Sequence, residues 1–293
     1  MFHPGEKLAQ QRAGFGEVRA ALYPALPEQH RQFFAGLHTF YLATLGEDGY
    51  PVAGLLQGEP GFISSPDPGL LRLTQHALQG TPLLPALKTG MAVGGLGIDF
   101  SNRRRNRVNG VVQAVSGEYV EVGVQESFGN CPQYIQRRFL PYNAGKGPVE
   151  TEQLEGLDAA ARYTLSAADT FFVASVAPRQ ANVGGVDISH RGGQPGFLTL
   201  EQGKLKIPDY AGNRYMNTLG NLLVEPRCAL LILDFQQGAA LHIQGKAEID
   251  WQKGEGLTER FWLLKIEKVW RIRQLFPPAG LDVEYAASSV AAG

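Results

Sequence analysis

Cysteine and charge are both scarce in this chain of 293 residues. The two cysteines, Cys131 and Cys228, form no Cys-x-x-Cys pair and no zinc-ligand spacing, which excludes a disulfide framework and a zinc finger. Lys and Arg number 27 against 28 Asp and Glu, so the net charge is -1 and no overall field attracts nucleic acid or an anionic membrane. Charged residues make up only 19% of the chain.

Long hydrophobic runs are missing as well. The longest apolar segments, such as residues 229–233, are far too short to span a bilayer. The N-terminal segment MFHPGEKLAQQRAGF is polar and lacks the apolar stretch of a signal peptide. We therefore expect a cytoplasmic protein that binds neither membranes nor nucleic acid.

The usual catalytic signatures are absent: Gly-x-Ser-x-Gly, His-Glu-x-x-His, the P-loop and Gly-x-Gly-x-x-Gly. His190 and His242 have no evident third partner for a metal, so a structural role is the better interpretation and no metal site is expected. The chain is instead rich in turn residues, with 36 glycines and 18 prolines beside 44% hydrophobic residues. This composition supports a sizeable core and favours a β-rich fold.

The sequence contains an internal repeat with an offset of 135 residues. Gly-Glu-Pro-Gly-Phe at 58–62 returns as Gly-Gln-Pro-Gly-Phe at 193–197, Ile-Asp-Phe at 98–100 as Leu-Asp-Phe at 233–235, and Asn-Gly at 109–110 as Gln-Gly at 244–245. Thr-Phe-Tyr-Leu-Ala-Thr at 39–44 resembles Thr-Phe-Phe-Val-Ala-Ser at 170–175 after an insertion of about four residues. Several matches in register indicate two copies of one domain, too few for a solenoid.

Both copies have the pattern of β structure. Apolar and polar residues alternate at 241–249 and at 120–124, which is typical of half-buried strands. One helix is expected in each copy, from Pro82 to near Gly90 and from about Arg214 to Leu223, with Asn213 as the candidate cap of the second. Many short strands with one helix between them predict a small antiparallel barrel.

This pattern divides the chain into four segments. Residues 1–37 are expected to be helical, 38–140 to form barrel one, 141–165 to form a linker with an acidic helix, and 166–285 to form barrel two. The pattern at 262–273 fits either the last strand of barrel two or a helix, and both interpretations remain open.

Polar residues gather at three places, more densely than a β-barrel requires. The first cluster follows a strand that begins near Val186 and consists of Ser189, His190, Arg191, Gly192 and Gly193. Two glycines beside an arginine allow a ligand to come close to the backbone.

The second cluster lies at the start of the expected barrel-two helix and contains Asn213, Arg214, Asn217 and Thr218. Backbone N–H groups at a helix N-terminus, together with an arginine, form a site for an anion such as phosphate. A capped helix with a surface arginine is the alternative interpretation of this cluster taken alone.

The third cluster is the run Asn-Arg-Arg-Arg-Asn-Arg at 102–107 in barrel one, which includes Arg103, Arg105 and Asn106. A solvated basic turn is the simplest interpretation of such a run. Nucleic-acid binding is a weaker one, because the chain has a net charge of -1 and the run has no interleaved aromatic residues.

As a set, these motifs resemble flavin-nucleotide-binding proteins related to pyridoxamine 5′-phosphate oxidase. The resemblance rests on Val-Asp-Ile-Ser-His-Arg-Gly-Gly-Gln-Pro-Gly-Phe at 186–197, Asp-Tyr-Ala-Gly-Asn-Arg at 209–214 and Asn-Thr-Leu-Gly-Asn-Leu at 217–222. Asn-Cys-Pro-Gln-Tyr-Ile at 130–135 also resembles a motif of this group, and residues 2–6 and 11–14 resemble the opening of its two-barrel members. The resemblance covers most of residues 1–250.

The resemblance implies a mainly β fold of two tandem, six-stranded split β-barrels that bind FMN between paired barrels, and a homodimer. It carries the phosphate and ribityl contacts over to six residues, namely Ser189, Arg191, Asn213, Arg214, Asn217 and Thr218. His190 or an arginine of 103–107 would stabilise the reduced flavin. The substrate-binding C-terminal arginine pattern of the oxidase itself has no clear match, so vitamin B6 activity is not implied.

The two copies differ at the positions of this expected site. Barrel one has Gly-Leu-Leu at 54–56 where barrel two has Ser-His-Arg at 189–191, and Pro-Leu at 82–83 where barrel two has Asn-Thr at 217–218. Conversely, the arginine run of barrel one corresponds to Gly-Ala-Ala-Leu-His at 238–242. We therefore expect one composite site, with the phosphate on barrel two and a loop at 103–106 contributed by barrel one of the same chain or of a second protomer.

Three classes of function follow. The first is an FMN-dependent oxidoreductase of a small-molecule substrate. The second is a non-catalytic carrier or sensor of a flavin or haem, built on the same split barrel. The third is a barrel pair without a ligand.

Overall fold

The computed structural model describes residues 2–129, 131–140, 142, 148–180, 183–252, 258–278 and 282–292. The first sheet contains β1 (Thr39–Leu45), β2 (Pro51–Gln57), β3 (Ile63–Ser64), β4 (Leu70–Thr74), β5 (Ala92–Asp99), β6 (Arg104–Val115) and β7 (Tyr119–Gly129). The second sheet contains β9 (Thr170–Gln180), β10 (Val183–Gly192), β11 (Thr199–Glu201), β12 (Lys204–Tyr210), β13 (Arg227–Asp234), β14 (Ala239–Asp250) and β15 (Thr258–Arg273).

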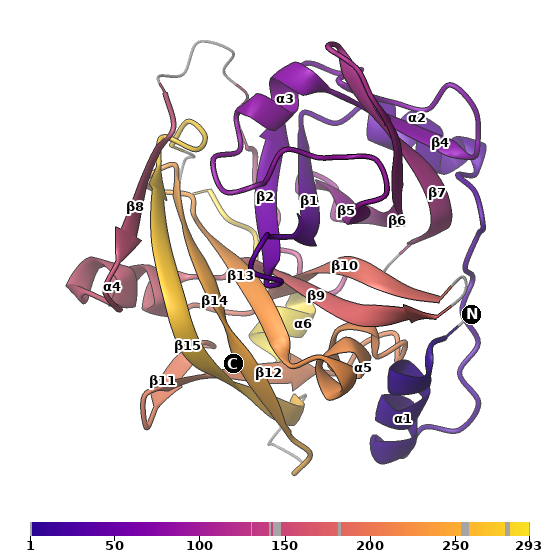
Figure 1. The fold of residues 1–293 in the computed structure, drawn as a ribbon. Helices are drawn as coiled ribbons and strands as arrows, with labels where there is room; N and C mark the ends of the chain where they lie inside the picture. Colours follow the sequence, from indigo (N-terminus) through magenta and orange to yellow (C-terminus); the bar gives the residue numbers. More distant parts are fainter. Residues whose placement is uncertain are drawn as a thin grey trace.

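The two sheets have the same antiparallel strand order. The first runs β2-β1-β5-β6-β7-β4-β3, and the second runs β10-β9-β13-β14-β15-β12-β11. Apart from β8 (Glu150–Leu154), which pairs with β15 outside this order, each strand of the second sheet therefore occupies the place of its repeat partner in the first. The expected fold of two tandem split barrels is confirmed, with a very short additional strand, β3 or β11, at the edge of each. Figure 1 shows barrel one in purple beside barrel two in orange and yellow.

A shared β-bulge shows how closely the repeats correspond. The register shifts between Asn109 and Gly110 in β6 and between Gln244 and Gly245 in β14. A Cβ atom on Gly110 or on Gly245 would lie 2.2 Å from a carbonyl oxygen of the neighbouring strand. Only glycine fits at this bulge, and for this reason the sequence repeats there.

Strands β1, β5, β9 and β13 are buried on both faces. In β9, Phe171 and Val173 face the interior of barrel two, while Phe172 and Ala174 join a cluster that contains residues of both barrels. In β1, Tyr41 and Ala43 join the same shared cluster. Burial on both faces accounts for continuous apolar runs in place of alternation. The shared cluster holds the barrels together within one chain.

The helices differ from the sequence prediction in several places. In copy one, the helix is α3 (Gln75–Gln79), and the expected helix from Pro82 to near Gly90 is wrong. Pro85 supplies no N–H and disfavours helical backbone at Leu84, which explains the failure. In copy two, the helix is α5 (Asn217–Val224) with Met216 as its N-cap, so the start at Arg214 and the cap at Asn213 are wrong.

The N-terminal segment forms two separate helices, α1 (Pro4–Arg12) and α2 (Glu28–Ala35). The apolar residues of α2 join the core of barrel one, whereas Ala9 of α1 joins the core of barrel two. Figure 1 shows α1 beside α5, with a long connection to barrel one. Helix α1 therefore packs on barrel two, although it precedes barrel one in the sequence.

The segment expected as a linker contains β8 (Glu150–Leu154), which pairs with β15, and α4 (Ala159–Ala167). The acidic residues lie in β8, at Glu155 directly after it and at Asp158, the N-cap of α4, whereas α4 itself has none, so the expected acidic helix is wrong. Residues 262–273 belong to β15, which decides between the two interpretations of that segment in favour of a strand. The last helix is α6 (Ala287–Val290). Within the described ranges, no helix is long and apolar enough to cross a membrane.

Candidate functional site

A pocket lies between the two barrels. Barrel one contributes Arg105 and Arg107 from β6, and barrel two contributes the end of β10, the loop after β12 and the first turn of α5. Among the described residues, those that line it are Phe15, Arg105, Arg107, Cys131, Gln133, Tyr134, Ser189, His190, Arg191, Gly192, Phe197, Pro208, Asp209, Tyr210, Gly212, Asn213, Arg214, Met216, Asn217, Thr218, Leu219 and Glu259. All of these residues come from one chain.

Most of the residues proposed from the sequence meet in this pocket. Eight of the ten line it: Ser189, His190, Arg191, Asn213, Arg214, Asn217, Thr218 and Arg105. Arg103 and Asn106 are not among the lining residues. Asn130, in the motif at 130–135, lies outside the described residues.

The arginine run does not form the expected loop. Residues from Arg104 onward belong to β6, so successive side chains point to opposite faces and only Arg105 and Arg107 reach the pocket. Arg103 precedes the strand, and its guanidinium bonds the Ile135 carbonyl and Glu284 instead. The expected contribution of Arg103 and Asn106 to the pocket is therefore wrong.

The glycines after Arg191 do not leave room for a ligand. A Cβ atom on Gly192 would lie 2.1 Å from the Tyr134 carbonyl oxygen, and one on Gly193 would lie 2.6 Å from the Phe197 ring. Both glycines accommodate other parts of the chain, which corrects the interpretation made from the sequence. Gly192 allows the segment around Tyr134 to run along the pocket.

Asn213, before α5, and Asn217, its first residue, make different kinds of contact. The Asn213 side chain accepts a bond from the Tyr215 N–H, which closes a local turn before the helix. Asn217 accepts a bond from Arg107 of barrel one and donates one to Glu6 of α1. Asn217 therefore ties three segments together at the edge of the pocket.

Among the described lining residues, positive charge exceeds negative charge by two, since four arginines accompany two carboxylates, Asp209 and Glu259. Arg191 donates to Asp209 at 2.6 Å, and Arg107 forms a buried ion pair with Asp187 outside the lining. Arg214 has no carboxylate partner among the residues that the structure describes. Its charge is therefore available to an anion.

His190 is buried between cationic groups. Burial, followed by the charges of Arg105, Arg191 and Arg138, lowers the pKa of His190 well below its usual range, so the ring is neutral at pH 7. Arg105 lies 2.9 Å from His190 Nδ1. A guanidinium can only donate, so Nδ1 accepts and Nε2 carries the proton. Burial and Arg191 lower the pKa of Arg105 to about 10, which leaves it charged at neutral pH.

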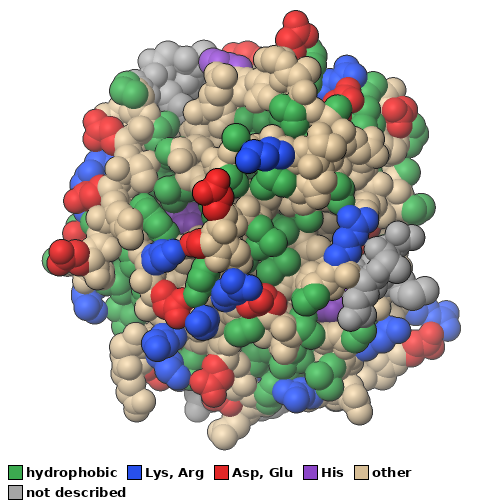
Figure 2. All heavy atoms as spheres, in the orientation of Figure 1, with side chains coloured by type: hydrophobic (Ala, Val, Ile, Leu, Met, Phe, Trp, Pro, Cys, Tyr) green, Lys and Arg blue, Asp and Glu red, His purple; other side chains and the backbone are tan. Residues whose placement is uncertain are grey.

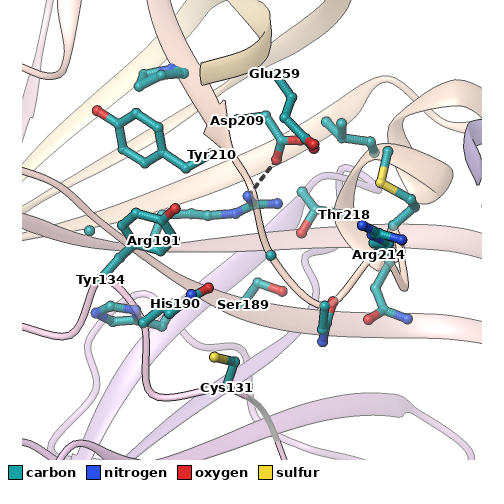
Figure 3. A pocket seen from close by; sticks show the side chains of 18 of the residues that line it. Cys131, Tyr134, Ser189, His190, Arg191, Asp209, Tyr210, Arg214, Thr218 and Glu259 are labelled. Atoms are coloured by element: carbon teal, nitrogen blue, oxygen red, sulfur yellow. Dashed lines mark hydrogen bonds and ion pairs between the residues drawn. The ribbon is translucent and has the colours of Figure 1, made fainter. Parts of the chain in front are cut away.

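Apart from Arg107 Nη2, which is ion-paired with Asp187, four buried donors of this pocket have no hydrogen-bond partner within the described part of the chain: His190 Nε2, Arg105 Nε, Arg107 Nε and Thr218 Oγ1. Thr218 is 2% exposed and lies in the first turn of α5. Figure 3 shows its hydroxyl beside the Arg191–Asp209 pair, with Arg214 on the other side. Unpaired buried polar groups are costly, so their concentration here indicates a polar ligand.

Aromatic residues outside the ten predicted from the sequence complete the pocket. Tyr134 and Tyr210 stack with ring centroids 5.0 Å apart, and the Tyr134 hydroxyl donates to the Ala211 carbonyl. Burial, with weaker effects of Tyr210 and Cys131, raises the pKa of Tyr134 to about 12. The motif at 130–135 was the available signal for Tyr134. Phe15 gave no signal, because it reaches the pocket from the far end of the sequence.

The corresponding region on the other side of the barrel pair is apolar. Leu84 packs where Gly54, the counterpart of Ser189, has no side chain: a Cβ atom there would lie 2.8 Å from Leu84. Leu55 and Ala240, the counterparts of His190 and Arg105, are buried in the shared core cluster. The counterparts of Arg191 and Arg214 at the offset of 135 are Leu56 and Gln79, which carry no charge.

The face of the molecule drawn in Figure 2 is mixed in character. On the face drawn in Figure 2, acidic and basic side chains are interspersed, and no area of one sign dominates. Across the described ranges, no group of three or more His, Cys, Asp or Glu residues is arranged to hold a metal ion. The pocket between the barrels is therefore the best candidate site.

No protein-family model and no curated protein matches this sequence. Among solved structures, the chain is similar to HupZ of Group A Streptococcus, with 13% identity over 39% of this chain and 98% of HupZ and a TM-score of 0.31. It is also similar to a protein of Lactobacillus delbrueckii provisionally named a pyridoxamine 5′-phosphate oxidase, at 17% identity over 38% of this chain and 99% of that one, with a TM-score of 0.28. An F420 reductase matches at 17% identity over 34% of this chain and 95% of its own, with a TM-score of 0.22.

Proposed function

We propose that the chain binds FMN in the pocket between its barrels and acts as an oxidoreductase on a small-molecule substrate. One observation carries the proposal: a pocket with an excess of two positive charges also contains buried donors that lack partners. The phosphate of FMN carries close to two negative charges at neutral pH, which matches this excess. The motif resemblance at 186–197 and 209–222 supports a flavin nucleotide in particular.

Residues of barrel two would hold the phosphate. Arg214 offers an uncompensated charge, Arg191 offers a guanidinium fixed by Asp209, and Thr218 offers a buried hydroxyl. Charge-assisted hydrogen bonds of this kind are the strong ones in phosphate recognition. Barrel one would contribute Arg105, which lies beside His190.

Bound FMN would supply the electron-transfer chemistry, and the chain supplies binding, orientation and electrostatics. His190 holds a proton on Nε2, and Arg105 holds a positive charge in the same buried region. A fixed donor and a fixed cation stabilise developing negative charge more strongly in a buried site than in water. Tyr134 and Tyr210 keep part of this region apolar.

A non-catalytic flavin carrier would use the same pocket, and turnover separates it from an enzyme. A haem carrier fits the geometry less well. Iron is ligated by an imidazole nitrogen that has a free lone pair, whereas the bond from Arg105 occupies Nδ1 and leaves the proton on Nε2 of His190. His190 would have to exchange its tautomer and lose this bond to bind iron.

The visible absorption spectrum of the purified protein tests the proposal, followed by titration with FMN. A flavin spectrum, or saturable FMN binding, is expected; a haem Soret band, or no binding of either group, would contradict the proposal. Arg191→Ala and Arg214→Ala are each expected to weaken FMN binding roughly ten- to a hundredfold, since a charged hydrogen bond contributes about 1.5–3 kcal/mol. Arg72→Ala is the control, because Arg72 pairs with Glu121 on barrel one.

Turnover of reduced nicotinamide nucleotides and oxygen by the FMN-loaded protein then separates enzyme from carrier. Both halves of the pocket come from one chain, so the proposal does not depend on a second protomer. The homodimer expected from the resemblance stays a prediction, and light scattering on the purified protein would check it.

A further inference from the structure

The N-terminal helix α1 packs on α5 more closely than side chains allow. A Cβ atom on Gly5 would lie 2.3 Å from the Gly220 carbonyl oxygen, and one on Gly220 would lie 2.5 Å from the Glu6 Cα. The two helices therefore touch through their backbones. Neither glycine tolerates a larger residue in this arrangement.

Polar contacts from α1 end on α5 or on the turn before it. His3 Nε2 lies 2.8 Å from Asn221 Oδ1, and Glu6 accepts a bond from Asn217. Gln10 donates to the Tyr215 carbonyl at 3.1 Å. These contacts fix the first turn of α5, which carries Thr218, and the residue that follows Arg214.

The turn before α5 has an unusual backbone. Arg214 and Met216 have φ angles of 63° and 61°, in the left-handed region that is unfavourable for residues with a side chain. Such a conformation persists where surrounding contacts impose it, often at a functional site. Tyr215, between the two, is held by Gln10 and contacts the ring of Phe2 at 5.7 Å.

Phe15 brings the N-terminal arm, residues 2–16, to the pocket. It lines the pocket, and its ring centre lies 5.2 Å from the guanidinium carbon of Arg214 and 5.6 Å from that of Arg260. Gly14, with a φ of 74°, turns the chain after α1 so that Phe15 reaches this position. The arginine with an uncompensated charge is therefore bordered by an aromatic ring from the arm.

We propose that the N-terminal arm, residues 2–16, contributes to phosphate binding by positioning Arg214. Helix α1 imposes the backbone of the Arg214–Met216 turn and so aims Arg214, while the ring of Phe15 lies against one side of that exposed guanidinium and limits its orientations. The inference rests on the proposed function in naming a flavin phosphate as the ligand. It adds that the arm serves recognition of the phosphate and not of the flavin ring.

Two variants of the arm and one control test this inference through ligand preference. Gly5→Val should separate α1 from α5, and Phe15→Ala should remove the ring beside Arg214; Leu8→Ala changes a residue of α1 that is 39% exposed. FMN and riboflavin, which lacks the phosphate, are each titrated by flavin fluorescence. FMN affinity should fall about tenfold in both arm variants, as for the loss of one charged hydrogen bond, with riboflavin affinity unchanged.

Two results would overturn the inference: equal loss of FMN and riboflavin binding in the arm variants, or unchanged FMN binding in both. Loss of FMN affinity in Leu8→Ala as large as in Gly5→Val would also overturn it, because a general effect on α1 would then suffice. A selective loss of FMN binding supports it. A purely structural role of the arm would not change the preference between the two ligands.

A flavin-free measurement separates this inference from the proposed function. Amide hydrogen exchange at residues 215–220 should accelerate at least about tenfold in Gly5→Val and remain unchanged in Leu8→Ala. Only the former loses the contacts of α1 that hold the turn before α5. An unchanged exchange rate in Gly5→Val would show that α1 does not hold the turn before α5, even if the wild-type protein binds FMN. Absence of FMN binding in the wild type would instead overturn the proposed function.

Discussion

Tyr41 and Phe172 are equivalent residues of the two repeats, and their rings stack on each other with centroids 3.5 Å apart and planes 16° apart. Residues related by a twofold axis can stack in this way only close to the axis. The contacts around the stack are reciprocal, since β5 meets β10 and β13 meets β2. The chain therefore pairs its barrels as a symmetric dimer pairs its subunits.

The stack should contribute strongly to stability, but its hydroxyl should not. Tyr41 is fully buried, and its hydroxyl has no hydrogen-bond partner among the described residues. We expect Tyr41→Phe to raise the free energy of unfolding by about 1 kcal/mol, because an unpaired buried group is removed. Tyr41→Ala should lower it by roughly 3–5 kcal/mol through the cavity it creates. Urea denaturation measures both, and a Tyr41→Phe protein less stable than wild type would contradict the expectation.

One chain should bind one FMN, although its fold is nearly symmetric. Arg191, Arg214 and Thr218 occur on one side of the barrel pair, whereas Leu55 and Leu84 occupy the other. Placing a phosphate dianion against leucine side chains would cost several kcal/mol of desolvation, comparable with the binding energy of a micromolar site. Extracted flavin measured against protein concentration should give a ratio near one after saturation.

A saturated ratio near two would show that the apolar side also binds, and would refute the division of the site. Arg214→Ala provides the matched control. It should lower occupancy at subsaturating FMN without creating a second class of sites.

The repeat made much of the fold predictable. The bulge at Gly110 and Gly245 and the turn before Phe62 and Phe197 depend on local backbone geometry, so the same residues recur in both copies. The apolar segment at 229–233 lies within the buried strand β13. The strand order follows once two copies of one barrel are assumed.

Features set by distant contacts could not be predicted from the sequence. The α1 helix lies on barrel two because Gly5 contacts Gly220, and the sequence around Gly5 does not indicate this contact. The Tyr134 backbone occupies the space beside Gly192, where the sequence had predicted a ligand. The arginine run was expected to be a loop but lies in a strand. Its side chains therefore alternate between two faces, so Arg105 points to the pocket and Arg104 points away from it.

Thr218 should show a trade between stability and binding. Its buried hydroxyl has no partner within the described ranges, so Thr218→Val should raise the unfolding free energy of the ligand-free protein by about 1 kcal/mol. The same change should weaken FMN binding about tenfold if the hydroxyl contacts the phosphate. Denaturation and FMN titration of the same preparation measure the two effects.

Thr44→Val is the matched control for Thr218→Val. The Thr44 hydroxyl donates to the Ala92 carbonyl at 2.9 Å in barrel one, away from the pocket. Its loss should lower stability by about 1 kcal/mol and leave FMN affinity unchanged. Equal behaviour of the two valine variants would refute a special role for Thr218.

His242 should make the protein less stable as the pH falls below about 6.5, the ordinary pKa of histidine. Burial lowers the pKa of His242 to about 4 in the folded protein. Nε2 of the ring accepts a bond from the Ala53 N–H at 3.2 Å, which fits a neutral imidazole. Between pH 6.5 and 4, the unfolded chain binds a proton that the folded protein does not, so the free energy of unfolding declines by about 3 kcal/mol from this residue.

His242→Gln removes this titration while keeping a side-chain oxygen that can accept from Ala53. Urea denaturation at pH 7 and pH 5 should therefore show a decrease in unfolding free energy about 2 kcal/mol smaller in His242→Gln than in the wild type. His190, whose pKa is also lowered by burial, continues to contribute in both proteins. His76→Gln, at an exposed position of α3, should leave the decrease as in the wild type. The same decrease in His242→Gln and the wild type would mean that His242 takes up its proton without unfolding, and that its burial between the barrels is less complete than the structure indicates.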